Sequence, residues 1–180
     1  MRTIRQLSRQ EIPEVWNIDR TELIENLYVQ QRDQLILTPQ CFDMQGWPEG
    51  EAEIYTPILL DSYDRGAFFL GVFAENENDK LIAVASVDPH WRGENSDLLQ
   101  LSFLHISKAY RGLGLGKQLF HCCIDFAKEK GAKGLYISSI PSENAVNFYR
   151  HIGCVLIAQP DIELYQREPD DIHLVYTIAT

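Results

Sequence analysis

The chain has 180 residues, of which 45% are hydrophobic, 11% aromatic and 23% charged, and this composition excludes a disordered, collagen-like or coiled-coil protein. Its formal net charge is −10, and the whole acidic excess lies in residues 1–100, which disfavours a nucleic-acid partner and favours a cationic one. No apolar run approaches the ~20 residues that a membrane span requires. We therefore expect a single soluble domain over residues 1–180, with no secretory signal and no membrane contact.

The cysteines and histidines bear on compartment and metal content. The four cysteines are Cys41, Cys122, Cys123 and Cys154, and they form no C-x-x-C pair. This pattern favours reduced thiols in a cytoplasmic protein over disulfides or a zinc site. The five histidines are scattered along the chain, so we expect no metal.

The first sixty residues predict secondary structure less clearly than the rest of the chain. Residues 3–7 alternate weakly and predict a short strand. Ser8 and Glu11 have the spacing of a capping box, which predicts a helix directly after them. Residues 22–30 have apolar side chains at helical spacing and predict that this helix continues or restarts. We expect residues 31–60 to form an irregular or short-helical insert on the substrate side.

The middle and end of the chain have clearer signals. Residues 67–74 and 81–87 predict an antiparallel hairpin, followed by a polar loop over 88–97. Residues 98–106 are almost continuously apolar, as in a central strand buried on both faces. The elements predicted after it are a helix that follows a glycine-rich turn at 111–117, a strand at 135–139, a second helix, a strand at 154–158 and a closing strand at 172–178. This order predicts an α+β chain with a βαβ unit in its centre.

A glycine-rich turn, Arg111-Gly-Leu-Gly-Leu-Gly-Lys117, joins the central strand to the next helix. The first turn of a helix presents unpaired backbone N–H groups and a partial positive charge, and glycines let a ligand lie directly on the backbone. The stretch 98–124 contains no acid, so we expect a phosphate or pyrophosphate site here. The turn fits neither a Walker A loop nor a dinucleotide-binding loop, which disfavours a kinase or dehydrogenase. A tight connection with no ligand is the alternative.

What the turn does fit is the pattern R-x-x-G-x-G, at Arg111, Gly114 and Gly116. Here the chain resembles the GNAT superfamily of acetyl-CoA-dependent N-acetyltransferases, whose members bind the CoA pyrophosphate at this motif. A second segment, Ala145-x-x-Phe-Tyr149-x-x-x-Gly153, is similar to the second signature of that family. The resemblance implies an α+β fold of α/β/α layers around a mixed, mostly antiparallel central sheet, with residues 98–158 as the acetyl-CoA-binding core.

The resemblance also implies roles for individual residues. The implied acetyl-CoA-binding residues are Leu104, Ile106, Arg111, Gly112, Leu113, Gly114, Leu115, Gly116, Lys117, Ser142 and Asn144. Backbone N–H groups near Leu104 and Ile106 are implied to stabilise the oxyanion. Tyr149 is implied to be the acid that protonates the leaving thiolate, because a phenol keeps its proton at neutral pH. The alternative for Tyr149 is a helix aromatic packed in the core.

Two departures from the family pattern leave roles open. Ser142 stands where the family often has asparagine, and it is a good N-cap instead, so Glu143 or Asn144 is left to replace that contact. Gln100 stands where some members have a glutamate base, and an amide cannot accept that proton. The remaining candidates for the base are His90, His105, a water relay and an acid from residues 43–64.

The sequence therefore predicts an enzyme that transfers acetyl from acetyl-CoA to a primary amine, by direct attack on the thioester and without a metal. The acidic half of the chain favours a cationic small molecule as acceptor. A recognition lid or a solvated loop is predicted from Asp43, Glu49, Glu51 and Glu53, together with Trp47 and Tyr55. A non-catalytic CoA-binding sensor module and a protein or peptide acetyltransferase are the alternatives. The oligomeric state is open, with a homodimer through the carboxy-terminal strands as one option.

Overall fold

The structure, a computed structural model, describes residues 1–179, which form two compact units. Unit 1 comprises Met1–Glu22, Met44–Pro89 and Leu101–Phe126. Unit 2 comprises Leu23–Asp43, His90–Gln100 and the chain from Ala127 onward. The boundaries do not follow a single cut in the sequence, because the chain passes between the units several times.

Unit 1 is built on four strands in the order β1-β4-β5-β6. Their bounds are β1 Arg2–Gln6, β4 Phe68–Ala74, β5 Lys80–Arg92 and β6 Leu98–Ile106. β1 and β5 both pair antiparallel with β4, so the predicted hairpin is confirmed. β5 and β6 both reach into unit 2 at one end. The loop predicted over 88–97 is wrong in its first half, because β5 continues to Arg92.

Helices pack on these strands through apolar faces. The short 3-10 helices of unit 1 are η1 Arg9–Asn17, η2 Glu75–Glu77 and η3 Lys108–Tyr110, and its α-helices are α1 Glu51–Asp64 and α2 Leu115–Glu129. The predicted capping box starts η1, where the Ser8 N–H donates to Glu11 at 2.8 Å. The buried core contains Ile12, Val15 and Leu59 from the helices. Burial of this apolar face stabilises helices that are too short to be stable alone.

Unit 2 contains three further strands in the order β7-β9-β8. Their bounds are β7 Gly134–Ser139, β8 Val155–Leu156 and β9 Ile172–Thr177. β9 pairs antiparallel with both of the others. α3 Glu143–Ile152 follows β7, as predicted, whereas the short α4 Ile162–Arg167 lies in a segment for which the sequence predicts no element.

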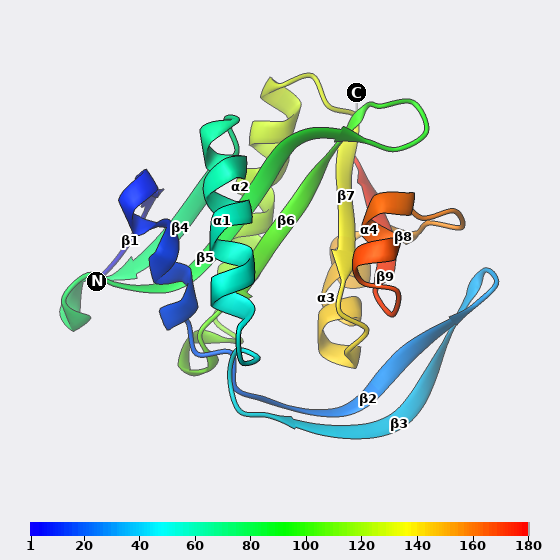
Figure 1. The fold of residues 1–180 in the computed structure, drawn as a ribbon, viewed down its shortest axis with the longest axis horizontal. Helices are drawn as coiled ribbons and strands as arrows, with labels where there is room; N and C mark the ends of the chain where they lie inside the picture. The colour runs from blue at the N-terminus through cyan, green and yellow to red at the C-terminus, as the bar shows by residue number, and fades with distance from the viewer. Residues whose placement is uncertain (180) are drawn as a thin grey trace. The chain divides into compact units, whose positions relative to one another are not determined.

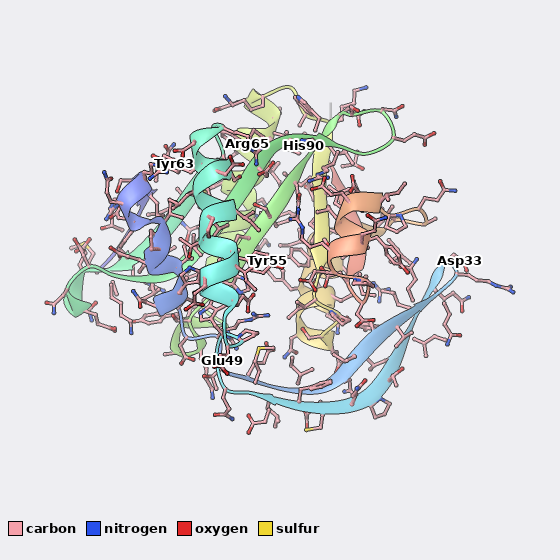
Figure 2. The ribbon with its side chains drawn as sticks, in the orientation of Figure 1. Asp33, Glu49, Tyr55, Tyr63, Arg65 and His90 are labelled. Atoms are coloured by element: carbon pink, nitrogen blue, oxygen red, sulfur yellow. The ribbon has the colours of Figure 1, made fainter. Side chains whose placement is uncertain are left out.

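The remaining pair of strands overturns two predictions. β2 Glu22–Gln31 and β3 Gln34–Met44 form a two-stranded sheet, so the helix predicted over residues 22–30 is wrong. The irregular or short-helical insert predicted over residues 31–60 is wrong where β3 lies, but α1 begins within it at Glu51. This hairpin is long and curved, with Asp33 at its tip (Figures 1 and 2). Most of its side chains are exposed or half-buried, so the sequence lacks the apolar alternation that marks a strand with one buried face.

The hairpin is anchored to the beginning of α3 within unit 2. The Tyr28 N–H donates to the Pro141 carbonyl at 2.8 Å, and the Tyr28 hydroxyl donates to Asn147 Oδ1 at 2.8 Å. Asn26 Nδ2 donates to Glu143 Oε2 at 2.7 Å. Isolated two-stranded hairpins are marginally stable in water, so these bonds to α3 stabilise the strand conformation.

Candidate active site

The glycine-rich turn lies in unit 1 between η3 and α2. Gly112 and Gly114 have φ of +75° and +80°, a backbone region that other residues rarely adopt. A Cβ built on either glycine meets no other described atom within 4 Å, so both lie against open space. α2 begins here, and the Gln118 N–H donates to the Gly114 carbonyl at 3.1 Å. The amides of the preceding residues have no carbonyl four residues back in the helix, and they are available to an anion.

Arg111 holds this turn against the end of β6 and the segment after η1. Its Nε donates to the Ile106 carbonyl at 3.0 Å, and its guanidinium also donates to the carbonyls of Thr21 at 3.0 Å and Asp19 at 3.4 Å. The side chain thus fixes the backbone around the turn. The contribution of Arg111 to phosphate binding stays a prediction, as does that of the exposed Lys117.

The other predicted cofactor residues of unit 1 divide by burial. Leu115 and Gly116 are buried at the start of α2, whereas Leu113 is 57% exposed beside the two open glycines. Leu104 and Ile106 are half-buried in the last residues of β6. The structure thus places these residues where the strand ends and the helix begins, and their contacts with acetyl-CoA stay predictions.

Phe103 and His105 alternate with Leu104 and Ile106 along β6, and they join an aromatic cluster in unit 1 with Trp16 and Trp47. Trp47 stacks on Phe103 with ring centroids 5.8 Å apart and contacts His105 edge-on at 4.8 Å. Trp47 Nε1 donates to the Ile18 carbonyl at 2.9 Å. Trp47 is therefore half-buried against the core of unit 1, and a role of its segment in substrate recognition stays a prediction.

The acids of the predicted recognition lid differ in their surroundings. Glu51 Oε2 lies 3.2 Å from Arg20 Nη1, and the Arg20 guanidinium lies over the Trp47 ring at 4.9 Å. Asp43, Glu49 and Glu53 are exposed. Figure 2 shows Glu49 just before α1 and Tyr55 on that helix.

The candidates for the general base differ in environment. Burial, together with the positive charges of Arg20 and Arg111, lowers the pKa of His105 to about 3, so this ring is neutral at physiological pH. His90 is exposed on β5, while Gln100 is buried on β6. Because neutral His105 has a weakly basic nitrogen, it is a poor acceptor for the proton of an ammonium group. The identity of the base stays open among His90, an acid and a water relay.

The residues predicted from the second signature lie on α3 in unit 2. Ser142 is buried and is the N-cap, where its hydroxyl accepts from the Ala145 N–H at 3.3 Å. Tyr149 is buried, and its ring centroid lies 5.1 Å from that of Phe148. Asn144 is exposed at the start of the helix. The N-cap interpretation of Ser142 is confirmed, while the catalytic role of Tyr149 and the cofactor roles of Ser142 and Asn144 stay predictions.

The sequence analysis missed a buried polar network in unit 2. Tyr136 on β7 and His173 on β9 lie side by side, with the Tyr136 hydroxyl 2.7 Å from His173 Nδ1. The hydroxyl also accepts from the Asp161 N–H at 2.8 Å. The sequence signal was a histidine inside an apolar closing strand, but only the strand pairing shows which side chain it meets. Among residues 1–179 there is no cluster of side chains suited to a metal, and no helix there is long and apolar enough to cross a membrane.

The family model described as the acetyltransferase (GNAT) family matches residues 31–154. This is more than half of the chain, so the protein belongs to the GNAT family and is an acetyl-CoA-dependent N-acetyltransferase. No curated protein matches the sequence significantly. The match confirms the predicted family and enzyme class. It disfavours the alternative of a non-catalytic CoA-binding sensor module.

Solved structures share the fold at low sequence identity. Nourseothricin acetyltransferase has a TM-score of 0.68 at 16% identity, with 97% of this chain and 95% of that one covered. A Bacillus anthracis str. Ames protein assigned as a streptothricin acetyltransferase, in complex with acetyl coenzyme A, has a TM-score of 0.70 at 17% identity, with 97% and 96% covered. The ribosomal-protein-S18-alanine N-acetyltransferase from Escherichia coli has a TM-score of 0.59 at 15% identity, with 100% and 97% covered. These similarities confirm the predicted α+β fold class with its mixed, mostly antiparallel strands.

The neutral state of His105 makes a prediction about acid stability. Its pKa is about 3 in the folded chain and 6.5 when exposed, so between these values the unfolded chain binds the extra proton. The His105 contribution to the free energy of unfolding should therefore fall by about 2 kcal/mol between pH 7 and pH 5. Urea unfolding of the wild type and of His105→Phe at both pH values measures this, and the variant should lose less stability on acidification.

Exposed His121 on α2 supplies the matched control, since His121→Gln should lose as much stability as the wild type over this range. An identical pH response of the wild type and His105→Phe would contradict the assignment of a neutral ring.

Proposed function

We propose that this enzyme transfers the acetyl group of acetyl-CoA directly to the primary amine of a cationic small molecule. The observation that carries the proposal is the amino end of α2, where the backbone is open at Gly112 and Gly114. Backbone N–H groups at a helix amino terminus bind phosphate groups, and the absence of acids from residues 98–124 lets an anion approach. Acetyl-CoA bound through its diphosphate supplies the activated thioester.

The chain's own residues have three tasks in the transfer. Backbone N–H groups near Leu104 and Ile106 are proposed to hydrogen-bond the oxyanion that forms when the amine attacks the thioester carbon, and such donors are worth about 3 kcal/mol of barrier. Tyr149 is proposed to donate its hydroxyl proton to the departing CoA thiolate. A base removes the proton that the attacking nitrogen loses, and His90, an acid of residues 43–64 and a water relay are the candidates.

The charge of the protein supports a cationic acceptor. Residues 1–100 hold all of the acidic excess, and a negatively charged surface concentrates cationic molecules near it. The fold is shared with nourseothricin acetyltransferase, whose name gives nourseothricin as its substrate. It is also shared with the Escherichia coli ribosomal-protein-S18-alanine N-acetyltransferase, so transfer to a protein or peptide amino group is the second candidate.

The cellular location and the assembly state of the enzyme also belong to the proposal. The cysteine pattern supports a cytoplasmic enzyme, because Cys123 and Cys154 are buried free thiols. Burial raises the pKa of the Cys154 thiol to about 12, so it stays protonated and poorly reactive at neutral pH. A homodimer through the carboxy-terminal strands remains one option.

Release of CoA thiol across a panel of acceptors tests the proposed function. We expect diamines and basic amino-acid amides to be acetylated with kcat/KM values about tenfold or more above those of neutral or anionic amines, because an acidic surface favours cations. The preference should weaken as the salt concentration rises. Turnover only with peptides that carry a free amino terminus would select the protein-substrate candidate, and a preference for anionic amines would contradict both.

Substitution Tyr149→Phe tests the proposed acid. Without the hydroxyl proton the thiolate departs unprotonated, so kcat should fall by about a hundredfold, in the range that general acid catalysis contributes. Titration calorimetry should show unchanged CoA affinity, because the ring remains. Phe148→Leu, on the adjacent position of α3, is the control for packing and should keep most of its turnover. Unchanged kcat in Tyr149→Phe across the pH range would assign Tyr149 to packing alone.

A further inference from the structure

A short segment between η1 and β2, residues 19–21, is bonded to the end of β6 and the start of η3 within unit 1. The Asp19 N–H donates to Ser107 Oγ at 3.0 Å, and the Lys108 N–H donates to the Asp19 carbonyl at 2.9 Å. Ser107 is buried, and its own N–H donates to the Ile82 carbonyl at 2.8 Å. The segment is therefore attached to the strands of unit 1 just before the glycine-rich turn.

The guanidinium of Arg111 joins this segment to the glycine-rich turn. Its Nη1 donates to the Thr21 carbonyl at 3.0 Å and its Nη2 donates to the Asp19 carbonyl at 3.4 Å, while its Nε donates to the Ile106 carbonyl at 3.0 Å. Backbone carbonyls thus engage all three nitrogens of the side chain. Since the carbonyls of Asp19 and Thr21 must face the guanidinium together, the conformation of segment 19–21 determines where Arg111 lies, and Gly112 follows it directly.

The Asp19 side chain sets the conformation of this segment. Its Oδ1 accepts from the Thr21 N–H, two residues on, at 2.9 Å, which closes an Asx turn. Hydrogen bonds from the Thr21 hydroxyl and N–H, together with the positive charges of Lys108 and Arg111, hold the pKa of the Asp19 carboxyl below its usual range. The carboxylate is therefore ionised at neutral pH and stays an acceptor for this turn.

The charge of Asp19 opposes the binding of an anion at the neighbouring turn. Residues 98–124 contain no acid, yet the fold brings this carboxylate within range of the charges of Lys108 and Arg111. A negative charge near a diphosphate repels it, so through charge alone Asp19 weakens the binding of CoA. Its presence is explained if the conformation that it imposes on segment 19–21 contributes more to binding than its charge removes.

We propose that Asp19 is a positioning residue for acetyl-CoA, because its carboxylate fixes the carbonyls that hold Arg111 and thereby the glycine-rich turn. The inference rests on the proposed function, since it concerns the proposed diphosphate site at the amino end of α2. It adds a requirement that the R-x-x-G-x-G pattern does not contain, because Asp19 lies 92 residues before Arg111. A turn that is ordered before the ligand arrives loses less conformational entropy on binding.

Calorimetric titration of CoA into two Asp19 variants separates positioning from charge. Asp19→Asn keeps an oxygen that can accept from the Thr21 N–H and removes the negative charge, so it should bind CoA at least as tightly as the wild type. Asp19→Ala removes the Asx turn as well, and it should weaken CoA affinity by about tenfold, the effect of one lost hydrogen bond. Tighter or unchanged binding of CoA by Asp19→Ala would overturn the inference.

Steady-state kinetics with an accepted amine supply a second readout. In Asp19→Ala the KM for acetyl-CoA should rise by about tenfold while kcat stays within about twofold of the wild type, because segment 19–21 is proposed to hold the cofactor site and not the reacting atoms. Asp125→Ala, which removes an exposed carboxylate from α2 in the same unit, is the control and should change neither constant.

Thermal melting identifies a variant that fails to fold. If Asp19→Ala does so, Thr21→Val carries the test, since it removes only the hydroxyl that bonds Asp19. It should weaken CoA affinity by about threefold, and unchanged affinity in this variant would overturn the inference.

Binding and turnover together distinguish failure of the inference from failure of the proposed function. CoA binding that Asp19→Ala weakens and Asp19→Asn preserves, without turnover of any amine by the wild type, would support the inference and overturn acetyl transfer to small amines. Turnover of cationic amines with the same CoA affinity in the wild type and Asp19→Ala would overturn the inference and leave the proposed function standing. Absence of CoA binding by the wild type would overturn both.

Discussion

The chemistry proposed for this protein depends on keeping the amino end of α2 open. Backbone N–H groups bind a diphosphate only where no side chain covers them, and Gly112 and Gly114 meet this condition with left-handed backbone angles and free space at the Cβ positions. Arg111 supports the same geometry, because its guanidinium donates to three carbonyls from two separate segments of unit 1. The turn is therefore held rigidly without a side chain over its exposed surface, and an anion can bind without reorganising it.

Local sequence signals predicted the part of the fold that carries this turn. The apolar run over residues 98–106, the glycines after it and the amphipathic pattern of α2 each encode their structure within a few residues, and β6 and α2 lie where expected. The hairpin formed by β2 and β3 shows the opposite case. Leu23, Ile24 and Leu27 are spaced as on a helix, but bonds from Asn26 and Tyr28 to α3 select a strand. Partners more than a hundred residues away cannot be inferred from local periodicity.

The residues of the candidate site also differ in how far the sequence predicts them. Short motifs predict some of them, whereas others depend on contacts between distant segments. The backbone requirement at Gly112 and Gly114, and the capping role of Ser142, follow from short motifs and were predicted from the sequence. Trp47 shows what local motifs leave out, since only the structure shows that its ring stacks on Phe103. The pairing of Tyr136 with His173 joins two strands that only the sheet brings together. Contacts between distant segments thus become visible only in the structure, while the glycine turn is encoded locally.

Calorimetric titration of CoA into matched glycine variants at the two ends of α2 tests the central claim most directly. Gly114 and Gly131 have φ of +80° and +81° and equally open surroundings, so a valine at either position imposes similar backbone strain. Only Gly114 lies beside the proposed diphosphate site. Gly114→Val should weaken CoA affinity by about a hundredfold, or about 2.7 kcal/mol, while Gly131→Val should bind CoA like the wild type. Equal affinities for CoA in all three proteins would contradict the account.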